Sequence, residues 1–281
     1  MIEVPENIGE VMVVATKGLG VSTATAHAII GHAVGKSRSW ILAHPEEPLS
    51  TEQVRLICNN LTWVRMGRPL AQVIGEREFC GLSFHITKDV LVPRPETEEF
   101  VHAILDWLDA QALDAPRLVD VGTGSGAIGV AVAVNRPDIS VVAVDISPEA
   151  LAVARRNVER HAVSHRVVCQ QGDLLAGLSS DFHVIAANLP YIAADVLAEL
   201  PVRRWEPRIA LDGGPDGLTL LEQLIAQAPA YLASPGLLAL EIGYDQGQAV
   251  RSLCQHAFPE ADVTIKKDFA GQDRIVLVEH P

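Results

Sequence analysis

From Arg117 to the C-terminus, short apolar runs alternate with stretches whose apolar residues recur every three or four positions. The short runs predict buried strands and the periodic stretches predict helices. Regular alternation of the two predicts right-handed crossovers and a parallel sheet with helices on both faces. The predicted strands are RLVDV, VVAVD, VVCQQGD, FHVIAAN, LLALEIG and a terminal pair around a glycine turn, which suggests an antiparallel strand at the end of the sheet.

Residues 1–70 show helical patterns and no strand pattern. In STEQVRLICNNLTWVRMG, Ser50 precedes Gln53 by three positions, which is a capping-box signal. STATAHAIIGHAVG predicts a second helix capped by Ser22 or Thr23. We therefore expect a small helical bundle. The apolar face of the first of these helices is predicted to hold Val54, Ile57, Cys58, Leu61 and Val64.

The pattern changes between about residues 72 and 92. REFCGLSFHIT alternates in polarity and contains Gly81, which predicts a β-hairpin. In VPRPETEE, two prolines two positions apart oppose a helix, and Thr97 with the acids after it can start one over 97–110. We expect a helical bundle at 1–72, a hairpin linker at 73–92 and an α/β domain at 93–281.

Bulk composition places the chain among globular proteins, because 48% of its 281 residues are hydrophobic and only 20% are charged. No apolar run reaches about 18 residues, so no membrane span is expected. The N-terminus has no basic segment before an apolar one and does not resemble a secretory signal. The four cysteines are scattered and lack metal-ligand spacing. We expect a cytoplasmic protein with reduced thiols and no metal site.

A net charge of −13 argues against a large generic nucleic-acid-binding face. The charge is unevenly distributed, since residues 1–70 hold six basic and six acidic side chains. The remaining chain carries 16 basic and 29 acidic side chains, which supports two domains with different surfaces. A local basic groove stays compatible with this total.

The segment VDVGTGSGAIG places a glycine loop directly after a predicted strand. Glycines bring bare backbone close to a ligand, and doubly wound sheets bind nucleotides at this point. Gly124, Gly126 and Gly129 satisfy the dinucleotide pattern GxGxxG, which taken alone is a weak signal. Asp120, two residues before the first glycine, suits a cationic amino-acid moiety and repels pyrophosphate. This combination favours S-adenosylmethionine over NAD or a purely structural turn.

Two further acids follow predicted strands. Asp145 ends the second strand and can accept both ribose hydroxyls of NAD or of S-adenosylmethionine, so it does not discriminate between them. Asp173 follows the third strand, where it can accept an adenine amine while Leu174 packs on the ring. A solvated turn aspartate is the alternative interpretation. The predicted cofactor contacts are Gly122, Thr123, Gly124, Ser125, Gly126, Asp145, Asp173, Leu174 and Asn188.

The apolar run FHVIAA ends in Asn188, followed by Leu189, Pro190 and Tyr191. This edge of the sheet is where a substrate meets a cofactor. The Asn188 oxygen and a main-chain carbonyl can accept both hydrogens of a planar NH₂ group, Pro190 fixes the turn and Tyr191 offers a ring for stacking. Accepting these hydrogens raises electron density on nitrogen, and positioning supplies the remainder of a methyl transfer. A helix-capping asparagine beside a core tyrosine is the bland alternative.

Asn-x-Pro-Tyr after the fourth strand resembles methyltransferases that act on the NH₂ of adenine, cytosine or glutamine. LVPRPETEEF, RRWEPRIALDGGPDGL and GLLALEIGYDQGQAV, with GKSRSWILAHPEEPLS and WVRMGRPLAQVIGEREF, resemble the HemK-type release factor glutamine methyltransferases. The resemblance covers nearly the whole chain. It implies a seven-stranded, Rossmann-like S-adenosylmethionine-dependent methyltransferase domain preceded by a helical bundle that docks the release factor.

The same resemblance implies the reaction and its residues. The target is the side-chain amide of the glutamine in the GGQ motif of peptide chain release factors, and the products include S-adenosylhomocysteine. Asn188, Pro190 and Tyr191 correspond to catalytic residues, and these three with Leu189 hold the glutamine. The PRPETE segment lies near the cofactor or acts as a rigid brace, and Glu206-Pro207 is a loop near the site or a helix boundary. No membrane and no direct nucleic-acid partner are expected.

One departure from the family pattern concerns Leu189, since the family usually has Asn-Pro-Pro-Tyr. Asn-Leu-Pro-Tyr is typical of ribosomal RNA adenine dimethyltransferases, which however lack the PRPETE and WEPRIAL segments. An adenine N6-methyltransferase acting on RNA or DNA is therefore the alternative function, with Arg203, Arg204 and Arg208 as the nearby basic cluster. A non-catalytic protein that retains the fold is a further alternative.

Overall fold

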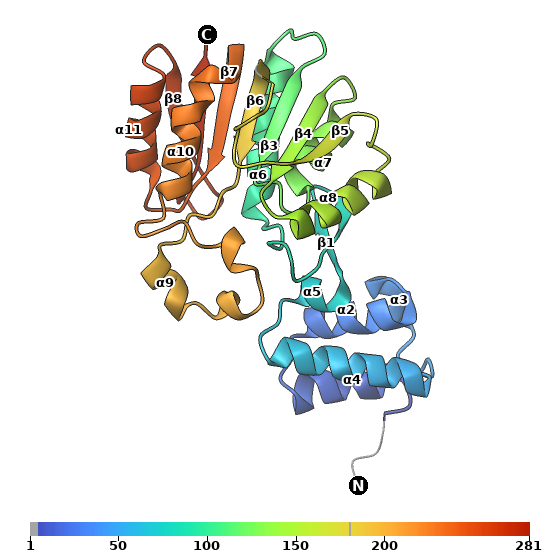
Figure 1. Cartoon of the computed structure of the whole chain (residues 1–281). Coiled ribbons are helices and arrows are strands. Elements are labelled where there is room, and N and C mark those ends of the chain that lie inside the picture. The colour runs from blue at the N-terminus through green and yellow to red at the C-terminus, as the bar shows by residue number, and fades with distance from the viewer. Residues whose placement is uncertain (1–4, 180) are drawn as a thin grey trace. The chain divides into compact units, whose positions relative to one another are not determined.

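The computed structural model describes residues 5–179 and 181–281. They form two compact units, Met1–Gly75 and Glu76–Pro281. Figure 1 shows their helices and strands. Within the described residues, no helix combines the length and the apolar character that crossing a membrane requires.

The first unit is helical, as predicted. α1 runs directly into a π-helical turn, Val14–Gly18. Each of the next three helices is capped by a serine whose hydroxyl accepts a backbone N–H from the residue three positions later. The three caps are Ser22, Ser37 and Ser50. The side chains of these helices enclose their own apolar core, which includes Ile29 and Ile57. The helices are α1 Ile8–Val13, α2 Thr23–Val34, α3 Arg38–Ala43, α4 Thr51–Arg65 and α5 Leu70–Ile74.

Helix α4 shows what the apolar pattern did and did not predict. The capping box of Ser50 and Gln53 is present, with both reciprocal hydrogen bonds. Cys58, predicted on the buried face, is exposed, and Asn60 is buried instead. Cys58 lies at the flank of the stripe, so a small rotation of the helix removes it from the core. The residues of the predicted face that are buried are Val54, Ile57 and Leu61.

The predicted hairpin forms at the start of the second unit. β1 Glu76–Phe79 pairs antiparallel with β2 Leu82–His85. The two turn residues, Cys80 and Gly81, both have positive φ, 49° and 71°, which is the backbone of a tight two-residue hairpin turn. The buried Asn157 side chain fastens the hairpin by accepting from the His85 N–H and donating to the His85 carbonyl. It also donates to the Ser125 carbonyl, so the hairpin and the glycine loop share one anchor.

A seven-stranded sheet with the order β5-β4-β3-β6-β7-β9-β8 forms the centre of the second unit. Its first five strands in this order are parallel, and β9 is antiparallel to both of its neighbours. The mostly parallel, seven-stranded prediction is confirmed. The strands are β3 Arg117–Val121, β4 Ser140–Asp145, β5 Val167–Gln171, β6 Phe182–Ala187, β7 Leu232–Glu241, β8 Asp262–Lys267 and β9 Asp273–His280.

The position of the antiparallel strand differs from the prediction. The last strand of the chain, β9, inserts between β7 and β8, and it is β8 that forms the edge of the sheet. In this position β9 is hydrogen-bonded to a strand on each side, and its apolar residues are buried. The edge strand β8 exposes part of its length. The apolar density of IVLV in β9 is the local reason for its interior place.

Helices cover both faces of the sheet. α7 lies on the face that holds Asp120 and Val141, because a side chain added to its Gly129 would touch both residues. α6 packs on α7 and β7, and α8 packs on β4 and β5. α11 packs on β8, β9 and α10, and α10 lies in front of the sheet in Figure 1. The helices are α6 Glu96–Ala110, α7 Ala127–Asn135, α8 Pro148–Arg160, α9 Ala194–Glu199, α10 Thr219–Gln227 and α11 Gly247–Ala257.

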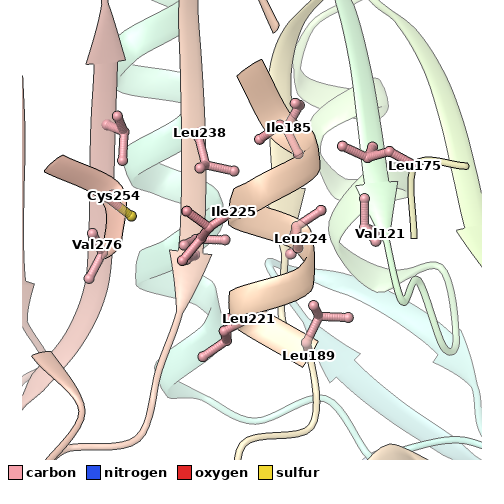
Figure 2. Close-up of a cluster of buried hydrophobic side chains, with 14 of the residues drawn as sticks. Val121, Leu175, Ile185, Leu189, Leu221, Leu224, Ile225, Leu238, Cys254 and Val276 are labelled. Atoms are coloured by element: carbon pink, nitrogen blue, oxygen red, sulfur yellow. The ribbon is translucent and has the colours of Figure 1, made fainter. Parts of the chain in front are cut away.

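The core beneath α10 reaches the sheet edge that carries the functional residues. Leu221, Leu224 and Ile225 of α10 belong to one buried cluster with side chains of β3, β6 and β7. Figure 2 shows Leu189 at the same end of α10 as Leu221. Leu189 therefore belongs to the hydrophobic core, with 4% of its surface exposed.

Candidate functional site

A cavity of about 210 Å³ opens at the carboxyl ends of β3, β4, β5 and β6. Its remaining wall comes from the segment before α6 and from Pro207–Ala210. Gly126 and Tyr191 are the two predicted site residues that are not among those lining it. The predicted residues that do line it are Gly122, Thr123, Gly124, Ser125, Asp145, Asp173, Leu174, Asn188, Leu189 and Pro190.

The glycine loop bends sharply at three positions. Gly122, Gly124 and Gly126 have φ values of +69°, +55° and +80°, which side chains rarely adopt. A side chain at Gly122 would also lie 2.9 Å from Leu189 Cδ2, and one at Gly126 would lie 3.3 Å from Ala154. Gly122 thus keeps the loop against the Asn188–Tyr191 turn. Gly126 lets the loop pack closely on α8. This contact explains why position 126 requires glycine, although Gly126 does not line the cavity.

Asp120 supports the glycine loop from beneath and does not line the cavity. It is fully buried, and its Oδ2 accepts the Thr123 hydroxyl at 2.6 Å and the Gly129 N–H at 2.9 Å. Burial raises its pKa to about 6 against the effect of these two donors. The prediction that Asp120 meets a cationic ligand group is therefore not supported by its position. Its carboxyl fixes the shape of the loop.

Asp145 joins the end of β4 to the glycine loop. Its Oδ2 accepts the Gly124 N–H at 2.8 Å and its Oδ1 accepts the Ser147 N–H at 2.9 Å. Burial raises the pKa of Asp145, and these backbone donors act in the opposite direction. Because each carboxylate oxygen can accept more than one hydrogen, both oxygens keep capacity for ligand hydroxyls.

Backbone N–H groups of the glycine loop are largely engaged within the protein. The Thr123 N–H donates to the Val144 carbonyl and the Gly126 N–H donates to the Thr123 carbonyl, in addition to the Gly124 bond with Asp145. A pyrophosphate site needs such groups free to face the phosphates. The loop is therefore poorly suited to a pyrophosphate.

Past β5, the backbone turns at Leu174, which adopts a positive φ of 52° although it is not glycine. The Leu174 side chain is buried and lines the cavity, while the neighbouring Asp173 is exposed and lines it as well. An apolar surface beside a carboxylate is the arrangement that was expected for an adenine. Conformational strain at Leu174 fits a position that is held for function.

Asn188 lies one residue beyond β6 and faces both the cavity and α6. Its Nδ2 donates to Thr97 Oγ1 at 3.3 Å. The helix predicted over about 97–110 is present as α6, which begins at Glu96, and the Thr97 side chain in its first turn lines the cavity. The Asn188 side chain is therefore held by the PRPETE segment, which is 91 positions away in the chain.

Tyr191 supports the turn from outside the cavity. Its ring packs against the core cluster, its hydroxyl hydrogen-bonds Arg274, and its carbonyl accepts from Gln246 Nε2 at 3.1 Å. Contact between this ring and a substrate stays a prediction. Since the Tyr191 carbonyl is engaged, the carbonyls that can serve a ligand are those of Leu189 and Pro190.

An ion pair joins two segments of the cavity wall. Arg94 Nη2 donates to both oxygens of Glu206, at 2.9 and 2.7 Å. The Glu206 side chain is fully buried and also accepts the Val92 N–H. Burial raises its pKa, and Arg94 acts in the opposite direction. The PRPETE and WEPRIAL segments, both noted in the sequence, thus meet in one wall.

Two residues of this region were not predicted. Glu241, at the end of β7, is 2% exposed, and Arg274 of β9 binds Asp268 and the Ile242 carbonyl. Their only sequence signal is an acid or a base at the end of an otherwise apolar strand. The same signal drew attention to Asn188.

Comparisons with known proteins agree with this geometry. The family model of the PrmC N-terminal domain matches residues 14–75, and that of the methyltransferase small domain matches residues 101–200. A release factor glutamine methyltransferase of Moorella thermoacetica is 41% identical over 256 residues, which cover 90% of this chain and 89% of the relative. The same-named protein of Burkholderia pseudomallei is 42% identical over 261 residues and 89% of each chain. A methyltransferase from Pyrococcus furiosus shares the fold, with a TM-score of 0.52 at 20% identity over 71% of this chain and 88% of that one.

Proposed function

Because the chain belongs to the family of release factor glutamine methyltransferases, we propose that it methylates a glutamine side-chain amide of peptide chain release factors. The target glutamine is that of the GGQ motif, and the methyl donor is S-adenosylmethionine. The observation that carries the proposal is the position of Asn188, whose amide borders the same cavity as the glycine loop and Asp145. The site thus brings a group that can hold an NH₂ to the place where a nucleoside cofactor fits.

The cavity residues suit S-adenosylmethionine. Asp145 keeps acceptor capacity for the ribose hydroxyls, Leu174 offers an apolar surface to the adenine and Asp173 can accept its amine. Gly122 to Gly126 allow close approach of the remaining part, and their engaged N–H groups disfavour a pyrophosphate cofactor. When bound, S-adenosylmethionine supplies a methyl group on a sulfonium sulfur and leaves as S-adenosylhomocysteine, which keeps the electron pair of the broken S–C bond.

The protein's own contribution is to hold and polarise the amide nitrogen. Asn188 Oδ1 and the carbonyl of Leu189 or Pro190 accept its two hydrogens, which raises electron density on nitrogen. Holding the nitrogen in line with the methyl group lowers the activation free energy, because the entropic cost of orienting the two reacting groups is met when the substrate binds. The nitrogen lone pair forms the new N–C bond, and one nitrogen-bound proton then passes to solvent. No strong base is required for this sequence.

The first unit contributes docking of the protein substrate in this proposal. Its support is the match of residues 14–75 to the PrmC N-terminal domain and the distinct, neutral charge balance of residues 1–70. The cysteines at positions 58, 80, 169 and 254 are all free, which agrees with the reduced cytosol as its compartment.

The nucleic-acid alternative loses support at Leu189 and at Arg208, one of the three arginines that suggested it. Leu189 fills the core beneath α10, so its presence is explained by packing. Arg208 pairs with Asp212 at 2.8 Å and is not an unengaged cation for a phosphate. Salt-dependent binding of RNA would be the sign that this conclusion is wrong.

The test is incubation of the full-length protein with labelled S-adenosylmethionine and a release factor, with a GGQ-to-GGA release factor as control. We expect label on the GGQ glutamine by peptide mass analysis and none on the control. Asn188→Ala should abolish transfer while cofactor binding weakens only in part. Transfer to the GGA protein, or wild-type turnover by Asn188→Ala, would contradict the proposal.

A further inference from the structure

A buried carboxyl group stands directly beside the Asn188 amide. Strands β6 and β7 are paired so that Ala187 lies opposite Leu240, which makes Asn188 and Glu241 neighbours at the ends of their strands. Glu241 is 2% exposed and is not among the residues that line the cavity. Any effect of Glu241 on a substrate must therefore pass through another side chain.

The hydrogen-bonding groups around Glu241 set the direction of the Asn188 amide. The Thr97 hydroxyl and the Asn188 amide lie near enough to the Glu241 carboxylate to lower its pKa as hydrogen-bonding groups. Asn188 Nδ2 also donates to Thr97 Oγ1. A carboxylate can only accept hydrogen bonds, so it faces the NH₂ end of Asn188 and repels its oxygen. The three side chains form one cluster, in which the NH₂ end of Asn188 is bonded to Thr97 Oγ1 and lies near the Glu241 carboxylate.

This arrangement leaves one group of Asn188 for the cavity, its Oδ1. An amide whose orientation were free could present either its oxygen or its NH₂ to a ligand, because the two ends have nearly the same shape. With the NH₂ end held by Glu241 and Thr97, the cavity meets an acceptor. An acceptor binds the NH₂ of glutamine and rejects the oxygens of the isosteric glutamate.

Charged groups around Glu241 are few. Arg274 of β9 stabilises the carboxylate from one side, and Glu96 of α6 opposes it from another. Arg274 also contacts Tyr191 and is paired with Asp268 at 3.1 Å. Glu241 Oε2 has no hydrogen-bond partner among the described residues. Burial, which is the largest influence, raises the pKa of Glu241 to about 7.

We propose that Glu241 is a positioning residue that orients the Asn188 amide, so that the site selects a side chain offering hydrogens, glutamine, over glutamate. The inference rests on the proposed function, because it assumes that a glutamine enters this cavity. Beyond the proposed function, the inference names the group that makes Asn188 present a hydrogen-bond acceptor to the cavity. Glu241→Gln keeps the size of the side chain but can pair with either end of Asn188, so it removes the orientation and little else.

The experiment compares wild type with Glu241→Gln, using full-length protein, S-adenosylmethionine and release factors that carry GGQ or GGE. Glu279→Gln, an exposed position near the far end of β9, is the matched control. For Glu241→Gln we expect kcat on GGQ to fall about tenfold or more, because one hydrogen bond no longer has a fixed direction. The binding preference for GGQ over GGE, measured by competition, should shrink by a similar factor. Wild type and the control should keep both values.

A pH profile adds a readout that general damage to the fold would not give. A protonated Glu241 can donate to Asn188 Oδ1, so wild-type kcat should rise with pH through about 7 and Glu241→Gln should lose this rise. A folded Glu241→Gln protein that keeps the wild-type preference for GGQ would overturn the inference, whether or not its kcat falls.

A second pair of variants decides the question if Glu241→Gln does not fold. Thr97→Ser keeps the hydroxyl that binds Asn188, and Thr97→Val removes it at similar volume. Because Glu241 remains in the valine variant to orient the amide, both variants should keep a preference for GGQ, and Thr97→Val should weaken it only in part. A complete loss of the preference in Thr97→Val, with Thr97→Ser unchanged, would overturn the inference, because it would assign the orientation to Thr97. Failure of the proposed function looks different, since wild type itself would then leave the GGQ protein unmethylated.

Discussion

Arg94 and Glu206 lie 112 positions apart in the chain, yet Arg94 Nη2 is 2.7 Å from Glu206 Oε2. The pair joins the segment before α6 to the loop before Pro207, and both segments line the cavity. Glu206 is buried and Arg94 is partly exposed, so the carboxylate depends on the arginine more than the reverse.

The first prediction concerns this pair. Arg94→Ala leaves a buried carboxylate without its cation, and we expect a loss of about 2 kcal/mol in the free energy of unfolding, reduced from the fully buried case by partial exposure. Urea denaturation measures it. Arg208→Ala, which breaks the more exposed pair with Asp212, should change the same quantity much less, because solvent screens this pair. Equal losses in the two variants would show that burial of Glu206 does not matter.

The second prediction concerns Gly122. Gly122→Ala forces a side chain into a backbone with φ of +69° and places it 2.9 Å from Leu189 Cδ2. We expect S-adenosylmethionine binding, measured by calorimetry, to weaken about tenfold or more because the loop must shift. Gly177→Ala has a similar φ of +76° but open space around it, so it should affect stability without affecting cofactor binding. Unchanged binding in Gly122→Ala would contradict the proposed place of the cofactor.

The third prediction concerns Leu189. Because this side chain belongs to the core beneath α10, Leu189→Ala should lower the free energy of unfolding by about 2–4 kcal/mol. Ile209→Ala, at a cavity-lining residue that is 56% exposed, should change it by less than about 0.5 kcal/mol. Thermal and chemical denaturation would measure both. A neutral Leu189→Ala would mean that the turn, and not the core, determines the residue at this position.

The fourth prediction concerns pH and Asp120. Its pKa is raised from 3.8 to about 6 in the folded protein, so the folded state binds this proton more tightly than the unfolded state. The resulting stability is fully present below about pH 3.8 and is lost as pH rises through 6, by up to about 3 kcal/mol. Relative to Asp120→Asn, wild type should lose stability between pH 4 and 6 and then keep a constant difference. Denaturation curves at several pH values would measure this difference in the free energy of unfolding. If the difference instead rose with pH, the hydrogen bonds to Asp120 would outweigh the effect of its burial.

Local patterns predicted the elements and most of the cavity wall. Ser50 and Ser147 act through a backbone N–H three positions away, so their roles as helix caps can be inferred from sequence spacing alone. The strand-end rule then placed Asp145, Asp173 and Asn188 at one edge of the sheet before any coordinate was known.

Roles that depend on the direction of a side chain could not be predicted in this way. Asp120 and Asp145 both flank the glycine loop, but only Asp145 lines the cavity, because it ends β4 whereas Asp120 lies inside β3, opposite Ala143 and two positions short of Asp145 in the register. Tyr191 packs against the core cluster and does not line the cavity, and Arg274, which lies 83 positions later in the chain, is near enough to lower its pKa. Glu241 and Thr97 became relevant only when β7 and α6 were placed beside Asn188.

The three hydrogen bonds of Asn157 bear on how this protein can be divided. One side chain ties the hairpin to the glycine loop through His85 and Ser125, and both the hairpin and the Arg94 segment precede residue 101, where the match to the methyltransferase small domain begins. A fragment cut at that match would lose one cavity wall and leave Asn157 with two open hydrogen bonds in the interior. The shortest piece expected to fold with an intact cavity starts at Glu76, so a catalytic fragment for crystallisation or ligand screening should be trimmed there and no further.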